Sequence, residues 1–342
     1  MNNELKFTVS DGFDDEGDQE VKRGTFSRNW KSEDELDELL DQIELGEITE
    51  IEALEKASPH LKANPNHLEW YNFVANRLWD LELRDQAAEV WEQAYKLGCS
   101  KIPKGFKGVI SWYEIDNRPF LRCVHGYILG LLHIKKYKEA LTLARKMLRW
   151  NKDDNLGVRY LVPDLQFATG DMDSAMKSYL QSAEEQPTLW YNAALIAYRQ
   201  DRFVEACTYV RRGIAGNPYV AEALTGRTVI NDHLYWHGSN LHGTDFALDY
   251  INAPVMFWQD EETDFVDWVF NCSHVLKERA DLMECHEGLT YEHDPKSRRP
   301  LVDKWQGLIS GIDDTLSEKL VRKVNSRLGN EVWPWDRQGL HR

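Results

Sequence analysis

The chain lacks any long apolar run, and it has little cysteine. None of its 342 residues falls in a stretch near the roughly 18 consecutive apolar residues that a membrane-spanning helix needs. Its five cysteines form no Cys-x-x-Cys pair, so we expect free thiols in a reducing compartment. The first twenty residues lack the basic-then-apolar plan of a secretory signal. We therefore expect a cytoplasmic protein with no membrane association.

Positive charge is also scarce. The chain has 41 Lys and Arg against 57 Asp and Glu, a net charge of −16, which argues against binding nucleic acid through its phosphates. Most of the excess lies in residues 1–58, which hold eighteen acidic and six basic side chains. Residues 1–30 show no apolar period and predict an acidic, disordered or loosely attached arm. This acidic stretch is either a solvated surface or a segment that docks on a basic partner.

The usual enzyme motifs are missing. The sequence has no GxxxxGK[ST] phosphate loop, no HExxH and no GxSxG. A helix would place His233 beside His237, with His242 nearby, but Gly238 follows directly and predicts the helix end. We interpret these histidines, and Cys272 and Cys285 with their neighbouring histidines, as structural. We expect no catalytic residue, no cofactor and no metal.

An internal repeat dominates the middle of the chain. Alanine anchors at Ala87, Ala140, Ala175 and Ala206 are each followed by a mostly bulky apolar or aromatic residue four later and a mostly small residue three after that. Two of the spacings lie near 34 residues, and the first is longer by an insert at 99–119. Before each anchor stands a short polar turn, and before each turn an amphipathic stretch. The predicted first helices are Leu68–Trp79, Leu121–Leu132, Leu156–Phe167 and Thr188–Tyr198.

This plan of helix, turn and helix, with prolines where repeats should end, resembles the tetratricopeptide repeat. The resemblance implies an all-α fold: a right-handed superhelical stack of antiparallel helix pairs, a TPR-like α-solenoid with degenerate helical caps. The expected organisation is the arm (1–30), N-terminal capping helices (31–67), repeats (68–220), a C-terminal helical capping region (221–330) and a tail (331–342). Thr49 with Glu52 has the spacing of a capping box within the first caps.

Three phrases narrow the resemblance. They are DNRPFLR (116–122), DDNLGVRY (153–160) and NPYV (217–220). Together they are similar to a subgroup of TPR-like proteins found in bacteria and in the suppressor of tumorigenicity family, whose molecular role is unassigned. Some bacterial members carry an SEC-C zinc segment. This chain lacks that cysteine pattern, so the resemblance implies no zinc.

Two sets of residues are candidates for binding. The insert and the first two phrases supply Trp112, Asp116, Asn117, Arg118 and Arg159, which either cap helices and pair with carboxylates or bind an acidic group. In tetratricopeptide repeats the first helices line a concave groove. Counting along those helices, the groove residues are Asn72, Asn76, Trp79, Arg122, His125, Tyr160, Asp164, Phe167, Tyr191 and Tyr198. The Lys and Arg positions of a chaperone-tail clamp hold other residues here, which disfavours that specificity.

The C-terminal region is predicted to be helical. An apolar stripe from Trp305 to Leu328 predicts one long helix that covers the last repeat or docks a second copy, and 288–300 read as a polar loop. Trp333 and Trp335 are expected to fold back onto that helix.

The sequence favours a non-enzymatic interaction module, a scaffold or adaptor that holds a protein or peptide segment in the repeat groove. The first alternative is a regulatory neutraliser that binds a basic protein through the acidic arm. The second is a helical, metal-dependent enzyme that uses His233, His237 and His242. The sequence does not identify the partner, the pathway or the oligomeric state, although the C-terminal helices could form a homodimer.

Overall fold

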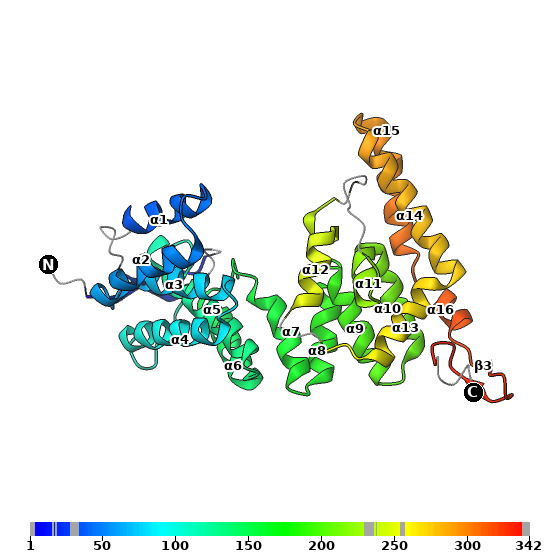
Figure 1. Cartoon of the computed structure of the whole chain (residues 1–342), viewed down its shortest axis with the longest axis horizontal. Coiled ribbons are helices and arrows are strands. Elements are labelled where there is room, and N and C mark those ends of the chain that lie inside the picture. Colours follow the sequence, from blue (N-terminus) through cyan, green and yellow to red (C-terminus); the bar gives the residue numbers. More distant parts are fainter. Residues whose placement is uncertain are drawn as a thin grey trace. The chain divides into compact units, whose positions relative to one another are not determined.

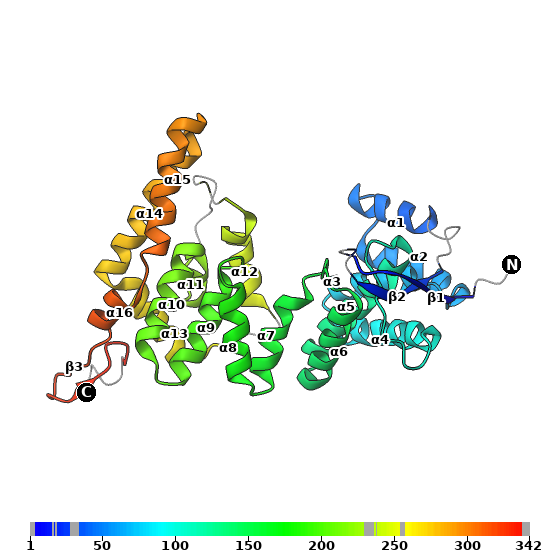
Figure 2. The same ribbon diagram turned by 180° about the vertical axis from the view of Figure 1, so that it is seen from behind.

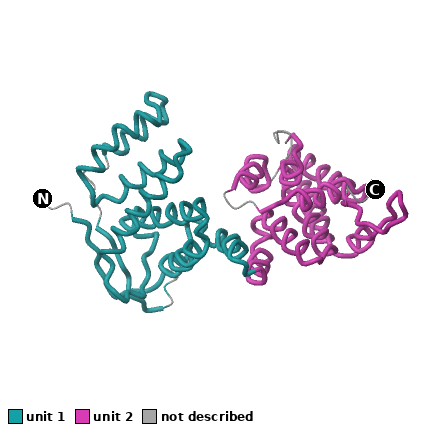
Figure 3. The backbone as a smooth tube through the Cα atoms, turned by 60° about the horizontal axis from the view of Figure 1, so that its bottom comes forward, with its two compact units in different colours: residues 1–171 teal, residues 172–342 magenta. Residues whose placement is uncertain are grey.

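The structure is a computed structural model that describes residues 4–15, 17, 19–27, 34–228, 236, 238–253 and 257–336. The chain divides into two compact units, Met1–Asp171 (unit 1) and Met172–Arg342 (unit 2) (Figure 3). The boundary falls within the predicted repeat region. Across the described residues the fold is all-α, with sixteen α-helices and two small two-stranded sheets. This confirms the predicted fold class, apart from the handedness of the helix stack.

In its described residues, unit 1 has a β-hairpin and seven α-helices (Figure 1). Its strands are β1 (Phe7–Phe13) and β2 (Glu20–Phe26). The helices are α1 (Asp34–Glu44), α2 (Glu50–Ala63), α3 (Leu68–Asp80), α4 (Arg84–Lys101), α5 (Arg118–His133), α6 (Tyr137–Trp150) and α7 (Val158–Ala168). The short 3-10 turn η2 (Ile115–Asn117) leads into α5. Thr49 and Glu52 form the predicted capping box of α2.

Unit 2 begins with α8 (Met172–Ser182), α9 (Thr188–Arg199) and α10 (Phe203–Gly216). The remaining elements are α11 (Pro218–Leu224), η3 (Asn240–His242), α12 (Thr244–Asn252), α13 (Asp260–Asn271), α14 (Ser273–Tyr291), α15 (Pro295–Ser310), α16 (Asp314–Leu320), β3 (Val324–Asn325) and β4 (Glu331–Val332). The long helices α14 and α15 form an antiparallel pair (Figure 1).

Four helices end in the same way, which gives the repeat a physical signature. The second residue after each first helix has a left-handed backbone: Glu82, Lys135 and Asp201 have φ of 61°, 60° and 57°, and Gly170 has 86°. In each case the next amide donates to the carbonyl five residues back, as Leu83 does to Leu78 at 2.9 Å. This is the Schellman arrangement that ends a helix and turns the chain. The predicted first helices are therefore confirmed as α3, α5, α7 and α9.

The alanine anchors lie in the second helices, α4, α6, α8 and α10, and all four are fully buried. Small residues allow close helix contacts on the partner helix as well. A Cβ atom added to Gly126 of α5 would lie 2.2 Å from the Trp91 ring of α4. Such overlap is not tolerated, so glycine is required where these two helices meet.

The N-terminal segment corrects one prediction. Strands β1 and β2 pair antiparallel, with Phe7 opposite Phe26, so they form a hairpin instead of part of a disordered arm (Figure 2). The Phe26 ring lies 4.6 Å from the Phe120 ring of α5 and is 1% exposed. Phe26 therefore packs on a helix more than ninety residues away, and this contact holds an acidic segment on the unit.

The C-terminal region corrects three further predictions. Residues 288–300 are not a loop, because α14 continues to Tyr291 and α15 begins at Pro295. The apolar stripe from Trp305 does not form one helix, because α15 ends at Ser310 and α16 begins at Asp314, whose start is capped by Asp313. Trp333 and Trp335 pack against Phe203 of α10 instead of the last helix.

Candidate partner-binding surface

The DNRPFLR phrase builds the start of α5. Its Asn117 side chain is fully buried and joins three segments: its Oδ1 accepts from the Phe26 amide at 3.0 Å, and its Nδ2 donates to the Gly24 and Ser111 carbonyls at 3.0 and 3.1 Å. Asn117 therefore holds the hairpin against the insert. The predicted capping role is wrong for this residue, because its side chain makes no cap hydrogen bond to α5. Asp116 is partly buried in η2.

Two arginines of the same phrase meet one tryptophan of the insert. The Arg118 and Arg122 guanidinium carbons lie 5.1 and 5.6 Å from the Trp112 ring centroid, and Arg118 Nε donates to the Trp112 carbonyl at 3.0 Å. The neighbouring Tyr113 is 62% exposed. We call Trp112, Tyr113, Arg118 and Arg122 the Arg–Trp surface. Stacking on the ring holds each guanidinium in place, and the edge of the guanidinium can still bind a carboxylate.

A carboxylate already occupies part of this surface. Arg122 Nη1 donates to Glu69 Oε1 of α3 at 2.6 Å. Asn72, one turn along α3, donates to the Pro119 carbonyl at 2.9 Å and is buried. Asn72 therefore joins α3 to α5, and the prediction that it lines an open groove is wrong, because both helices cover its amide.

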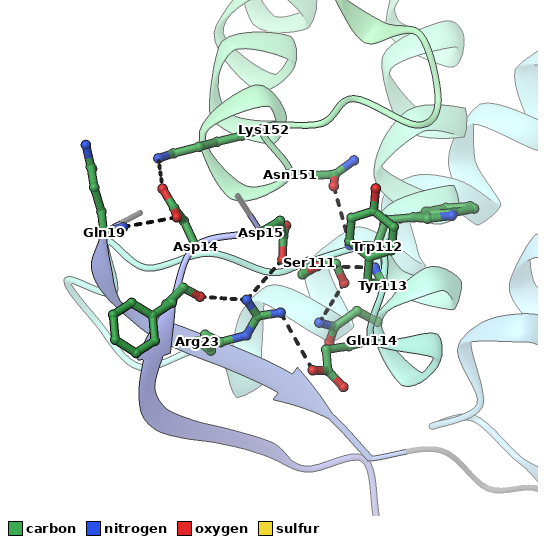
Figure 4. Close-up of polar contacts among 12 residues, drawn as sticks. Asp14, Asp15, Gln19, Arg23, Ser111, Trp112, Tyr113, Glu114, Asn151 and Lys152 are labelled. Carbon is green, nitrogen blue, oxygen red and sulfur yellow. Dashed lines mark hydrogen bonds and ion pairs between the residues drawn. The ribbon is translucent and has the colours of Figure 1, made fainter. Parts of the chain in front are cut away.

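Figure 4 shows how the hairpin is attached beside this surface. The Arg23 guanidinium donates to the Phe13 carbonyl at 2.7 Å, pairs with Asp15 at 3.0 Å, and reaches Glu114 of the insert at 3.6 Å. Asp14 pairs with Lys152 at 3.4 Å. Backbone bonds add to this, since Gly24 N donates to the Val109 carbonyl at 2.8 Å. Two acidic residues of the predicted arm are thus used inside unit 1.

The second phrase starts α7. Both oxygens of Asp154 accept from backbone amides, of Val158 at 2.7 Å and of Arg159 at 2.8 Å, so this carboxylate holds the start of the helix. Arg159 lies over the Tyr160 ring at 4.5 Å and donates to its hydroxyl at 2.9 Å. The third phrase acts similarly: Asn217 accepts from the Tyr219 amide at the start of α11.

The remaining groove residues of unit 1 differ in accessibility. Asn76 is exposed on α3, whereas Trp79 is partly buried, with its ring 5.5 Å from that of Trp91. In α7, Asp164 is partly buried and Phe167 is buried. Among these four, Asn76 is the most accessible, and the prediction that Phe167 lines an open groove is wrong, because its side chain is 4% exposed.

The two groove residues of unit 2 have different roles. Tyr191 is 0% exposed, and its hydroxyl donates to the Asn217 carbonyl at 2.9 Å, so the prediction that it lines an open groove is wrong. Its ring fills the space beside Gly213, whose added Cβ would lie 2.7 Å away. Tyr198 is partly buried in a cluster of aromatic rings with Trp335.

His125, also predicted for the groove, is partly buried in α5, and burial lowers its pKa from 6.5 to about 4. The folded protein therefore binds this proton less tightly than the unfolded chain does. The stability contributed by neutral His125 is complete above pH 6.5 and declines as the pH falls toward 4.

We expect the free energy of unfolding to fall by about 1–2 kcal/mol more in wild type than in His125→Gln between pH 7 and pH 5. Urea denaturation of both proteins at the two pH values measures this difference. His133→Gln, at a partly exposed histidine of the same helix, is the control. Equal losses in wild type and His125→Gln would contradict the expectation.

The predicted histidine cluster is only partly visible. His233 and His237 lie outside the described residues, and His242 Nδ1 donates to the Gly216 carbonyl at 2.5 Å. Within the described ranges no three His, Cys, Asp or Glu side chains are grouped as metal ligands would be. None of the helices that the structure describes has both the length and the apolar character needed to cross a bilayer.

An open pocket of about 480 Å³ lies between α4, α5 and α6. Tyr95 and Tyr127 stack in it with ring centroids 5.3 Å apart, and burial raises the pKa of both. Lys146 donates to the Tyr95 hydroxyl at 3.3 Å and lies over the Trp150 ring. Tyr127 donates to Glu92 at 3.0 Å, so both tyrosine hydroxyls of the pocket have partners, which favours a packing role.

Sequence reasoning singled out the insert that carries Tyr113 but did not select Tyr113 as a binding residue. It also missed the Glu69 carboxylate that pairs with Arg122 and the aromatic rings that cover Trp335. The aromatic content of the insert was the available sign for Tyr113. The other two depend on contacts between distant segments.

A scan against protein-family models and a search of curated proteins found no match to this chain.

Proposed function

We propose that the chain is a non-enzymatic interaction module whose Arg–Trp surface binds an acidic segment of a partner protein. The observation that carries the proposal is the pair of arginines stacked on Trp112 beside an exposed tyrosine. Tryptophan, tyrosine and arginine are the residues that dominate binding energy at protein interfaces. Here they are adjacent on one surface.

The chemistry suits a carboxylate next to an apolar side chain. Glu69 already pairs with Arg122, so the position of that guanidinium suits a carboxylate. Arg118 binds the Trp112 carbonyl through Nε, which leaves its terminal nitrogens directed to other acceptors. A partner carboxylate would bind there in a forked geometry, while Tyr113 and Trp112 supply apolar contact.

The helical repeats supply the rigid base of this surface. We infer a TPR-like stack, and the four matching helix ends and the buried alanine anchors support that inference. We also place the protein in the cytoplasm. Its five cysteines are all free, as is usual in a reducing compartment.

Neutralisation of a basic protein by the N-terminal segment has less support. Asp14 and Asp15 are buried in ion pairs with Lys152 and Arg23. An acidic segment that binds a basic partner would keep such carboxylates accessible. We therefore favour the Arg–Trp surface as the binding site.

The test is affinity capture from the native host with full-length protein and the variant Arg118→Ala/Arg122→Gln. Glutamine at 122 retains a donor for Glu69, so that carboxylate is not left unpaired. We expect a captured partner to bind the variant at least tenfold more weakly, which corresponds to about 1.4 kcal/mol. Titration of the purified partner by calorimetry measures the change.

The matched control is Arg145→Ala/Arg149→Ala, which removes two exposed arginines of α6. It should bind as wild type does. A loss caused by general electrostatic attraction would instead weaken both variants equally. Circular dichroism checks that each variant is folded. Unchanged binding by the Arg118/Arg122 variant would exclude this surface, and the absence of any captured partner would contradict the interaction function.

A further inference from the structure

Trp333 and Trp335, near the end of the chain, contact a set of aromatic rings in unit 2. The Trp335 ring lies 4.9 Å from Phe265, 5.0 Å from Trp268 and 5.1 Å from Phe203, with Tyr198 at 6.4 Å. We call Tyr198, Phe203, Phe265 and Trp268 the aromatic seat. Trp335 is 5% exposed, although most of residues 322–331 are exposed.

The seat is held in place independently of the tail. Tyr198 lies in the last turn of α9, Phe203 begins α10, and Phe265 and Trp268 belong to α13. Arg199 ties α13 to α9 through an ion pair with Glu262 at 2.6 Å and also donates to the Phe257 carbonyl at 2.6 Å. The seat is therefore a preformed surface of packed helices.

The tail that covers it has its own local structure. The Asp336 amide donates to the Trp333 carbonyl at 3.0 Å, which closes a turn with Pro334 in its second position. Proline fixes the backbone angle that this position of a turn requires. Trp333 and Trp335 stack in parallel at 5.0 Å, and Lys323 lies 5.4 Å from the Trp333 ring. This Trp-Pro-Trp turn is thus preorganised.

From these contacts we infer that the aromatic seat is a second peptide-binding site, which the chain's own Trp-Pro-Trp turn occupies until a partner segment displaces it. The partner that fits is a protein segment with a proline between two aromatic residues, one on each side. The inference rests on the proposed interaction function but concerns a different unit and a different chemistry. A turn shaped before binding loses little entropy on binding.

Displacement is feasible because the attachment is narrow. Two indole rings supply the ring contacts to the seat, and the backbone bonds of Ser326 and Gly329 are made within the tail itself. The tail is tethered about a dozen residues after α16, so its local concentration is on the order of millimolar. A free segment must bind the seat tightly enough to displace the tethered tail. The covered seat is therefore selective for partners of high affinity.

The experiment uses a fluorescent peptide with the sequence of residues 324–336 as the probe. We expect the full-length variant Trp333→Ala/Trp335→Ala to bind it at least about tenfold more tightly than wild type does, as measured by fluorescence anisotropy. Adding Trp268→Ala to that variant should abolish the gain. Arg327→Ala/Leu328→Ala, at exposed tail positions, should behave like wild type. A peptide with both tryptophans replaced should not bind.

If the tryptophan variant does not fold, a protease site inserted at the exposed turn 327–330 gives a second measurement. After cleavage of the folded protein, the terminal fragment should dissociate on dilution and be displaced by added peptide. A fragment that never dissociates, or equal peptide binding by wild type and the folded variant, would overturn the inference.

Sedimentation of wild type tests the remaining possible occupant of the seat, the tail of a second copy of this chain. A dimer that disappears in Trp333→Ala/Trp335→Ala would assign the seat to the tail of a second copy and overturn the choice of a foreign segment. Since the peptide assay needs no natural partner, its outcome does not depend on whether the Arg–Trp surface binds one.

Discussion

Replacing Arg211 by methionine is expected to lower the free energy of unfolding of unit 2 by about 2–4 kcal/mol. Arg211 of α10 is buried, with its side chain 1% exposed, and it pairs with Glu278 of α14 at 2.6 and 2.9 Å. It also donates to the Asp313 carbonyl and the Ser317 hydroxyl at 2.7 and 2.8 Å. One guanidinium therefore joins α10 to α14 and to the start of α16.

Methionine fills a similar volume but leaves these acceptors without a donor. Glu278 is 29% exposed and recovers some hydration, which places the loss toward the lower part of the range for broken buried pairs. Urea denaturation measures the loss, and hydrogen exchange should show faster exchange in α16. Lys319→Ala, at an exposed position of α16, should change stability little.

The double variant Arg211→Met/Glu278→Leu tests the cause. If the loss comes from an unpaired buried carboxylate, the double variant should recover a large part of it, because two apolar side chains can replace an ion pair. A double variant less stable than the single one would instead assign the loss to packing. A single variant as stable as wild type would show that the ion pair contributes nothing.

The repeats could be predicted from the sequence because their determinants are local. An alanine anchor and the apolar spacing around it define a helix face within fifteen residues, as they do for Ala87 and Ala206. The left-handed residue two positions after each first helix was harder to predict. Only Gly170 is a glycine, and Glu82, Lys135 and Asp201 stand at the equivalent position of the other three turns. Helix packing imposes the turn there in spite of their preferences.

The hairpin and the tail could not be predicted, because their stability comes from partners far away in the sequence. Phe26 is buried by Phe120, and Trp335 is buried by Phe265. Each segment is acidic or polar by composition, and a pattern of neighbouring residues contains nothing about such contacts. The Arg–Trp surface was predicted in part, since Trp112, Arg118 and Arg122 were selected without knowing that they meet.

Tyr191 shows why counting along a helix failed as a guide to the groove. Its position on α9 matches a groove position of the repeat, yet a glycine on α10 opens space for its ring inside the unit. Because that glycine leaves room for the ring, Tyr191 is a core residue instead of the predicted contact residue. Accessibility depends on the volume of the facing helix, which repeat spacing does not encode.

Replacing Asn117 by alanine is expected to have the larger effect, a loss of about 3–5 kcal/mol from the stability of unit 1. Its amide satisfies the Phe26 N–H and the Gly24 and Ser111 carbonyls, in a position with no solvent exposure. Each buried group left without a partner costs about 1–3 kcal/mol, and the hairpin bonds adjacent to them weaken as well. Denaturation by urea measures the total.

The local consequence separates this role from general packing. Amides of residues 20–27 should exchange with solvent much faster in Asn117→Ala, while those of α6 change less, because Asn117 holds the hairpin and does not contact α6 through its amide. Asn155→Ala, which alters an exposed asparagine in the second phrase, is the matched control and should leave both rates unchanged. Uniform acceleration across unit 1 would mean that Asn117 stabilises the helices as a whole. Unchanged exchange in the hairpin would show that Phe26 packing alone retains it, and the three hydrogen bonds would then be a consequence of docking instead of its cause.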